Sequence, residues 1–151
     1  MAIRSCYSAV LSVPGHPQAF ATLLPWVACL TFLPSDPRVP VVQWRIGDRT
    51  VASDCTQAFR QAQVPYDLQV RHGADDLYDL FIEYFRPEGF PGGPVRRVPT
   101  TEEGALYLPL SDWDAVAARP GGPITREDVL AHLGVPPRSL ADWCHAHRSV
   151  S

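Results

Sequence analysis

Residues 41–52 read VVQWRIGDRTVA, and this stretch carries the clearest local signal in the chain. Two short strand-like runs, 41–46 and 49–52, flank the pair Gly47-Asp48. A Gly-Asp pair suits the two-residue turn with positive φ that joins neighbouring antiparallel strands. The stretch therefore predicts a β-hairpin.

The residues before the hairpin predict one strand and one helix. Apolar and polar side chains alternate over residues 3–13, which is the pattern of a half-buried strand. Pro17 suits the first turn of a very apolar helix that we expect to run to about Leu33. Pro25 lies inside that helix and should kink or split it, because proline lacks the N–H that the helix needs.

Beyond the hairpin, the pattern predicts a short helix and a further strand. Ser53 is a suitable N-cap for a helix over 54–63, and residues 64–71 alternate like a strand. Residues 75–85 are ambiguous, because they combine a helical apolar stripe with the aromatic and β-branched content of a buried strand. For this segment we favour a helix.

Residues 87–110 predict a loop and two strands, and a helical tail follows them. The Pro- and Gly-rich segment 87–94 predicts a loop, and strands are expected over 95–98 and 105–110. Within the tail, Ser111 is expected to cap a helix over 112–118.

Two further helices are predicted near the end of the sequence. Thr125 and Asp128 form a capping-box pattern, and Gly134 suits the left-handed end of the helix that they open. Pro137 then opens a last helix that should end at about His147.

These elements together predict an α+β fold for residues 1–151, taken as a single domain. We expect a small, mostly antiparallel sheet with packed helices and a C-terminal αα-hairpin, within a helical tail over 111–148. The 151 residues suit one domain, and a content of 46% hydrophobic and 19% charged residues is typical of globular proteins.

The charged residues exclude several kinds of chemistry. All 13 basic residues are arginine, so the chain has neither a Schiff-base lysine nor a phosphate-loop lysine. Absence of both Lys and Asn indicates a G+C-rich genome, bacterial or viral. The net charge of −3 gives no general attraction to nucleic acid or to acidic membranes.

The cysteines and the apolar segments favour a cytoplasmic protein. Cys6, Cys29, Cys55 and Cys144 are scattered, with no C-x-x-C pair, so we expect reduced and mostly buried thiols. The longest apolar run, residues 19–33, is interrupted by Pro25 and is shorter than the roughly 20 residues that span a bilayer. No membrane partner is expected.

Residues 125–147 resemble a helix–turn–helix unit, in which the second helix enters the major groove of DNA. The resemblance implies DNA contacts from Arg126, Arg138, Ser139 and Arg148. Asp142 would repel phosphate, and few other basic side chains are available. A plain αα-hairpin packed on the sheet is the favoured interpretation, with DNA binding as the alternative.

Two groups of residues are weak candidates for metal binding or catalysis. Cys144 and His147 are three residues apart on the last predicted helix, but no second cluster completes a zinc site, so we expect no metal or other cofactor. His72 with Asp75 or Asp76 could act as a general base, and Cys55 could act as a nucleophile near a helix start. Neither group carries a catalytic signature, so we assign no catalytic residue.

Two aromatic residues favour protein recognition. Phe90 lies in the Pro- and Gly-rich segment, and Trp113 lies between Asp112 and Asp114 at a predicted helix start, although Trp113 also suits a core position. Exposed aromatic side chains on rigid segments give contact area at little entropic cost.

We therefore expect a non-enzymatic protein-binding domain of the immunity, antitoxin, adaptor or inhibitor type. The alternatives are a DNA-binding regulator and a small hydrolase-type enzyme. The sequence leaves the oligomeric state open.

Overall fold

The computed structural model describes residues 7–34, 36–72, 80–90, 93–101, 103–118, 121–136 and 139–146. Within these ranges the chain forms one six-stranded sheet with the strand order β2-β3-β1-β4-β5-β6, in which every neighbouring pair is antiparallel. The strands are β1 (Ser8–Pro14), β2 (Leu30–Leu33), β3 (Val41–Ile46), β4 (Tyr66–His72), β5 (Phe81–Phe90) and β6 (Gly93–Pro99).

The helices are α1 (Pro17–Leu23), the 3₁₀ helix η1 (Leu24–Cys29), α2 (Arg49–Ala62), α3 (Leu110–Ala117), α4 (Arg126–Leu133) and α5 (Leu140–Ala146). This mixture of helices around an antiparallel sheet confirms the predicted α+β class.

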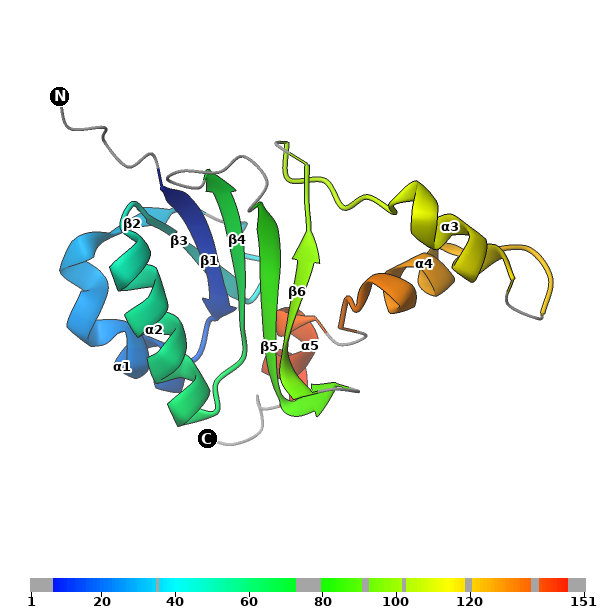
Figure 1. Cartoon of the computed structure of the whole chain (residues 1–151). Helices are drawn as coiled ribbons and strands as arrows, with labels where there is room; N and C mark the ends of the chain where they lie inside the picture. Colours follow the sequence, from blue (N-terminus) through cyan, green and yellow to red (C-terminus); the bar gives the residue numbers. More distant parts are fainter. Residues whose placement is uncertain are drawn as a thin grey trace, which may run out of the picture.

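The first half of the chain follows a known arrangement. The element order β1-α1-β2-β3-α2-β4 places four strands in the order β2-β3-β1-β4, which is the split βαβ or ferredoxin-like arrangement. Strands β5 and β6 extend the sheet beyond β4, and helices α1 and α2 cover one face of the sheet (Figure 1). Helix α5 packs against β1 from the other face (Figure 1).

The main core lies between α2 and the sheet. Helix α2 buries Ala52, Cys55, Thr56 and Phe59, which share one face of a helix. Opposite them, alternate residues of the central strands are buried, among them Leu11, Val13, Ile46, Tyr66 and Leu68. The alternation of the central strands thus places their apolar face against α2.

The predicted hairpin over residues 41–52 is wrong. Strand β3 ends at Ile46, and Asp48 is the N-cap of α2, because its side chain accepts hydrogen bonds from the backbone N–H of Thr50 at 2.7 Å and of Val51 at 3.3 Å. An aspartate after a glycine suits a helix N-cap as well as a turn. The helix is favoured here because Ala52 begins the stripe that α2 buries, and β3 pairs with β1 and β2 instead.

The long helix predicted over residues 17–33 is also wrong beyond Leu23. Pro25 ends the α-helical hydrogen bonding, and the chain continues as η1 and then as β2. Leu30 pairs with Ile46, so the end of the apolar segment completes the edge of the sheet. The split expected at Pro25 is confirmed.

Residues 81–85 belong to a strand, not to the favoured helix, and β5 continues to Phe90 through the predicted loop. Residues 73–79 and 91–92 lie outside the described residues. Both faces of β5 are buried around Glu83, Tyr84 and Phe85, so the sequence lacks the polar-apolar alternation of a half-exposed strand. A register shift between Phe85 and Phe90 accommodates Pro87 in the pairing with β6.

The strand predicted over 105–110 is reduced to one bridge between Thr100 and Leu106. Helix α3 starts at Leu110, and Pro109, not Ser111, is its N-cap.

Several other local predictions are confirmed. Strands β1, β4 and β6 overlap the segments predicted over 3–13, 64–71 and 95–98. Strand β1 begins at Ser8, and residues 3–6 lie outside the described residues. Thr125 and Asp128 form the predicted capping box of α4.

Gly134 ends α4 at a φ of +88°, and a Cβ there would come within 2.8 Å of the Arg96 side chain on β6. Glycine is therefore required both by the backbone conformation and by the close approach to the sheet.

Among the described residues, no helix is long and apolar enough to cross a lipid bilayer.

Candidate functional site

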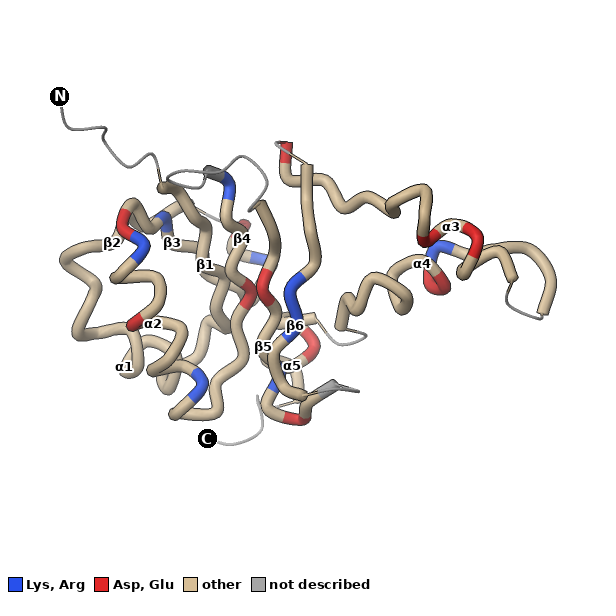
Figure 2. The backbone as a smooth tube through the Cα atoms, in the orientation of Figure 1, with Lys and Arg blue, Asp and Glu red and all other residues tan. Residues whose placement is uncertain are grey.

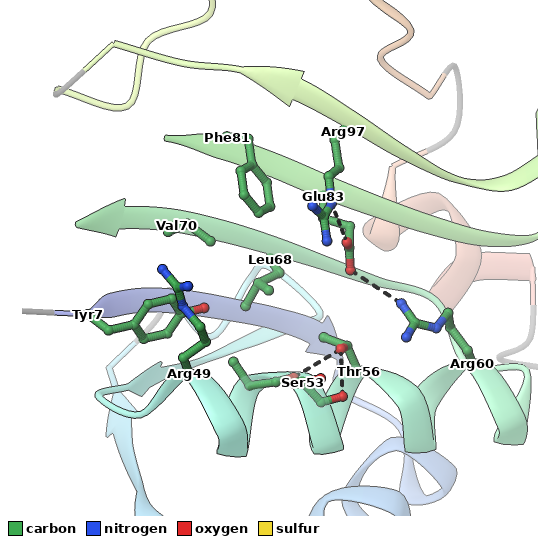
Figure 3. A pocket seen from close by; sticks show the side chains of 11 residues that line it. Tyr7, Arg49, Ser53, Thr56, Arg60, Leu68, Val70, Phe81, Glu83 and Arg97 are labelled. Atoms are coloured by element: carbon green, nitrogen blue, oxygen red, sulfur yellow. Dashed lines mark hydrogen bonds and ion pairs between the residues drawn. The ribbon is translucent and has the colours of Figure 1, made fainter. Parts of the chain in front are cut away.

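A cavity of about 420 Å³ opens between α2 and strands β4, β5 and β6 (Figure 3). Arg49, Ser53, Thr56 and Arg60 line it from α2, because they lie four, three and four residues apart along one side of the helix. The facing wall is the sheet, whose strands β5 and β6 extend past the helices that cover β1 and β4.

A buried carboxylate occupies one part of this cavity. Glu83 is only 3% exposed, and its Oε1 atom accepts a hydrogen bond from Arg97 Nε at 2.9 Å. Its Oε2 atom accepts one from the Tyr66 hydroxyl at 2.5 Å, with Arg60 Nη1 at 3.6 Å. Both oxygens therefore have donors, as a buried charge requires.

Burial raises the pKa of Tyr66, and the neighbouring Glu83 charge raises it further. The phenol therefore stays protonated at neutral pH and remains the donor to Glu83.

The other part of the cavity has a cation without such a partner. The Arg49 guanidinium lies over the Tyr7 ring, 5.6 Å from its centroid. No hydrogen bond or ion pair joins Arg49 to any of the described residues. A guanidinium stacked on a ring still presents its N–H groups at its edge, so Arg49 can receive an anion.

The floor between these two parts is apolar. Leu68, Val70 and Phe81 project from β4 and β5 into the cavity (Figure 3). Arg97 lies over the Phe81 ring at 4.5 Å while it donates to Glu83. Three arginines against one glutamate give the lining a net positive charge.

The lining residues offer hydrogen-bond donors and one buried carboxylate. They include neither a histidine nor a cysteine, and the buried carboxylate is held by its donors. Among the lining residues, no nucleophile has a general base beside it.

Of the candidate catalytic residues, the structure describes the surroundings of Cys55 alone. Cys55 is fully buried in the core, and burial, with the Asp54 charge, raises the pKa of its thiol to about 12. At neutral pH that thiol is protonated, and a thiolate is the form that attacks. His72 is the last residue of β4, and Asp75 and Asp76 lie outside the described residues.

The helix pair implied by the helix–turn–helix resemblance is not formed. Helix α4 packs against α3, whereas α5 packs against β1 (Figure 1). Leu140 and Trp143 of α5 are buried, and Asp142 is exposed. The αα-hairpin of the tail is formed by α3 and α4 instead.

Of the candidate DNA contacts, the structure describes Arg126 and Ser139, which lie at the starts of two different helices. Arg126 is exposed at the start of α4, and Ser139 accepts a hydrogen bond from the backbone N–H of Asp142 at the start of α5. Arg138 and Arg148 lie outside the described residues.

Of the two candidate metal ligands, the structure describes Cys144. Cys144 is buried, and its thiol donates to the backbone carbonyl of Pro40 at 3.1 Å, while His147 lies outside the described residues. In the described part of the chain, no three His, Cys, Asp or Glu side chains gather as metal ligands.

A second candidate surface lies on the α3–α4 pair, which projects beyond β6 (Figure 1). Leu110 is 85% exposed, Trp113 is 46% exposed and Tyr107 is 43% exposed. We call these three residues the α3 surface. Trp113 is thus a surface residue, and the core alternative for it is wrong. The side chain of Phe90 lies outside the described residues.

The charge around the α3 surface is acidic, as Figure 2 shows along α3 and α4. Asp112 and Asp114 flank Trp113, and the Asp112 carboxylate lies 3.8 Å from His132 Nε2 on α4.

No known protein family, curated protein or solved structure matches the chain. The function is therefore argued from these two sites.

Sequence reasoning missed the cavity. Its one local signal is the polar stripe Arg49, Ser53, Thr56 and Arg60, which shows only when residues 49–62 are taken as a helix.

Proposed function

We propose that this chain is a non-enzymatic protein-binding domain that engages its partner through the α3 surface. The observation that carries the proposal is the exposure of Leu110 and Trp113, three residues apart on one helix that buries only Val116. Residues so spaced share one helix face. Large apolar side chains that gather on one exposed face are typical of protein interaction sites.

The chemistry of the surface defines the partner. Trp and Leu offer apolar anchors, and Asp112 and Asp114 add negative charge beside them. The complementary surface is an apolar pocket with basic residues at its rim. A cytosolic immunity, antitoxin, adaptor or inhibitor protein of a high-G+C bacterium or phage would use such a surface.

A pair of matched double variants tests this proposal. The first, Leu110→Ser with Trp113→Ala, removes the α3 surface. The second, Leu24→Ser with Phe32→Ala, removes an equally exposed apolar pair on η1 and β2, where Leu24 is 70% exposed and Phe32 is 53% exposed. Both variants should keep the melting temperature of the wild type, because surface substitutions rarely change stability by more than about 0.5 kcal/mol.

The readout is affinity capture from nuclease-treated lysate of the native host. We expect one stoichiometric protein with the wild type and with the Leu24/Phe32 variant, and its loss with the Leu110/Trp113 variant. Retention of that protein by the Leu110/Trp113 variant would refute the proposal. So would a bound species that disappears on nuclease treatment, since the chain would then bind nucleic acid.

A further inference from the structure

The arginine-lined cavity is not used by the α3 surface. It lies beside α2, on the face that α1 and α2 cover, whereas α3 projects beyond β6 at the far side of the sheet (Figure 1). Its volume of about 420 Å³ is within the range of sites that hold small molecules, roughly 300–1,000 Å³.

The charges in the cavity select the charge of the ligand. Arg97 donates a hydrogen bond to the Glu83 carboxylate, and Arg60 lies 3.6 Å from the same carboxylate. The charges of these two arginines are therefore partly balanced by Glu83. Arg49 makes no ion pair with a described residue. One guanidinium with no ion pair among the described residues, in the same cavity as a buried carboxylate, favours a monoanion, because Glu83 repels additional negative charge.

A second donor lies next to that guanidinium. No hydrogen bond joins the Tyr7 hydroxyl to a described residue, and burial raises the pKa of this phenol, so it stays neutral and able to donate. A guanidinium over the ring of a phenol offers two kinds of donor in one place, and a carboxylate accepts charge-assisted hydrogen bonds from such donors.

The apolar wall of the cavity indicates the chemistry of the uncharged part of the ligand. Leu68, Val70 and Phe81 form an apolar wall between Arg49 and the Glu83 ion pairs (Figure 3). Small polar anions would leave this wall in contact with water, whereas a flat apolar group would cover it.

We propose that the cavity binds a small organic carboxylate with a flat apolar body. The carboxylate is held by Arg49 and the Tyr7 hydroxyl, and the body lies on Leu68, Val70 and Phe81.

Four compounds separate the contribution of the carboxylate charge to the affinity from that of the flat apolar group. These are 2-naphthoate, the uncharged 2-naphthalenemethanol, acetate and inorganic phosphate, each titrated into the full chain by calorimetry at neutral pH. We expect saturable one-site binding of 2-naphthoate, about tenfold or more tighter than the alcohol, because a hydrogen bond to a charged group gives roughly that factor. Acetate and phosphate should bind more weakly than 2-naphthoate.

Two cavity variants and a control locate the binding. Arg49→Gln should remove the preference for 2-naphthoate over the alcohol, whereas Arg45→Gln, at an exposed arginine outside the cavity lining, should keep it. Ser53→Phe places a ring in the cavity from an exposed position of α2 and should weaken both naphthyl probes. Both positions are exposed, so the variants should fold, and circular dichroism checks this.

Several outcomes would overturn the proposal: no binding of 2-naphthoate, equal affinity for acid and alcohol, wild-type affinity in Arg49→Gln, or tighter binding of phosphate than of 2-naphthoate. None of these bears on the capture experiment at the α3 surface.

Discussion

The sheet with α1, α2 and α5 differs from the α3–α4 pair in what its side chains contact. Helix α2 buries four residues against the sheet, and its Phe59 is completely inaccessible to solvent. Helix α3 buries only Val116, helix α4 has no buried residue, and Leu110 and Trp113 are exposed. Both regions carry large apolar side chains, but only the first uses them to stabilise the fold.

The difference separates stability from recognition. Apolar area removed from water stabilises the folded chain, while apolar area left in water is available to a partner. We therefore expect substitutions in α2 to change the free energy of unfolding, and substitutions on the α3 surface to change binding. Three predictions test this separation.

The largest effect is expected for Phe59→Ala. The ring is fully buried and contacts Tyr66 edge to face, so its removal should lower the free energy of unfolding by about 3–5 kcal/mol. Trp113→Ala removes a larger ring but should change the free energy of unfolding by less than about 0.5 kcal/mol. Urea unfolding followed by circular dichroism measures both. Similar losses for the two variants would mean that the α3–α4 pair folds as part of the main core.

A smaller effect is expected from alkaline pH, and it should arise in the sheet region. Burial raises the pKa of Tyr66 and Tyr7 and raises the pKa of Tyr84 and of Cys55 to about 12. Above the ordinary pKa of each group the unfolded chain loses protons that the folded chain keeps. The free energy of unfolding therefore falls as pH rises, beginning near pH 9 for the thiol and near pH 10 for the phenols.

Urea unfolding at pH 8, 9, 10 and 11 measures this fall. In Tyr66→Phe the free energy of unfolding should fall less steeply above pH 10, by up to about 1.4 kcal/mol per pH unit. A free energy of unfolding that stays constant to pH 11 would contradict the burial of these groups.

The smallest effect compares one helix cap in each region. Asp48→Ala removes the N-cap of α2 and should lower the free energy of unfolding by about 1 kcal/mol, while the same measurement on Thr125→Ala, at the N-cap of α4, should show a smaller loss. The reason is that α4 can fray without exposing the core. Asn replacements, which keep a capping oxygen, serve as controls. An equal loss for both Ala variants would show that α4 unfolds together with the sheet.

The sequence correctly predicts those local structures that depend on interactions within a few residues. The Thr125 and Asp128 capping box forms between residues three apart, and the left-handed helix end at Gly134 is a local backbone conformation; the structure has both. Pro25 likewise splits its helix because of its own ring. Such features need no information about the rest of the chain.

The errors arise where two local structures are equally suitable. Gly47-Asp48 suits a hairpin turn or a helix N-cap, and the burial of Ala52, Cys55 and Phe59 against the sheet selects the helix. The pattern of 81–85 suits a helix or a strand, and pairing with both β4 and β6 selects the strand. In each case the free energy that decides comes from residues distant in the sequence.

Of the two candidate sites, one is visible in the local sequence and the other depends on residues distant in the sequence. The sequence made Trp113, with Asp112 and Asp114, a candidate for protein recognition, because an aromatic residue between two carboxylates is visible in the sequence itself. Whether Trp113 lies in the core or on the surface depends on what packs against α3, and the fold leaves it exposed. The cavity joins Arg49 of α2 to Arg97 of β6, and no short-range pattern links them.

The sequence by itself determined the α+β class, the caps and breaks of individual helices, and the arginine-only basic chemistry of the chain, because each follows from residue type and short-range spacing. The tertiary structure alone decided the strand order, the separation of α4 from α5, and the meeting of Arg49, Glu83 and Arg97 around one cavity. The physical reason is that burial and charge pairing act between side chains that become neighbours only when the sheet has formed.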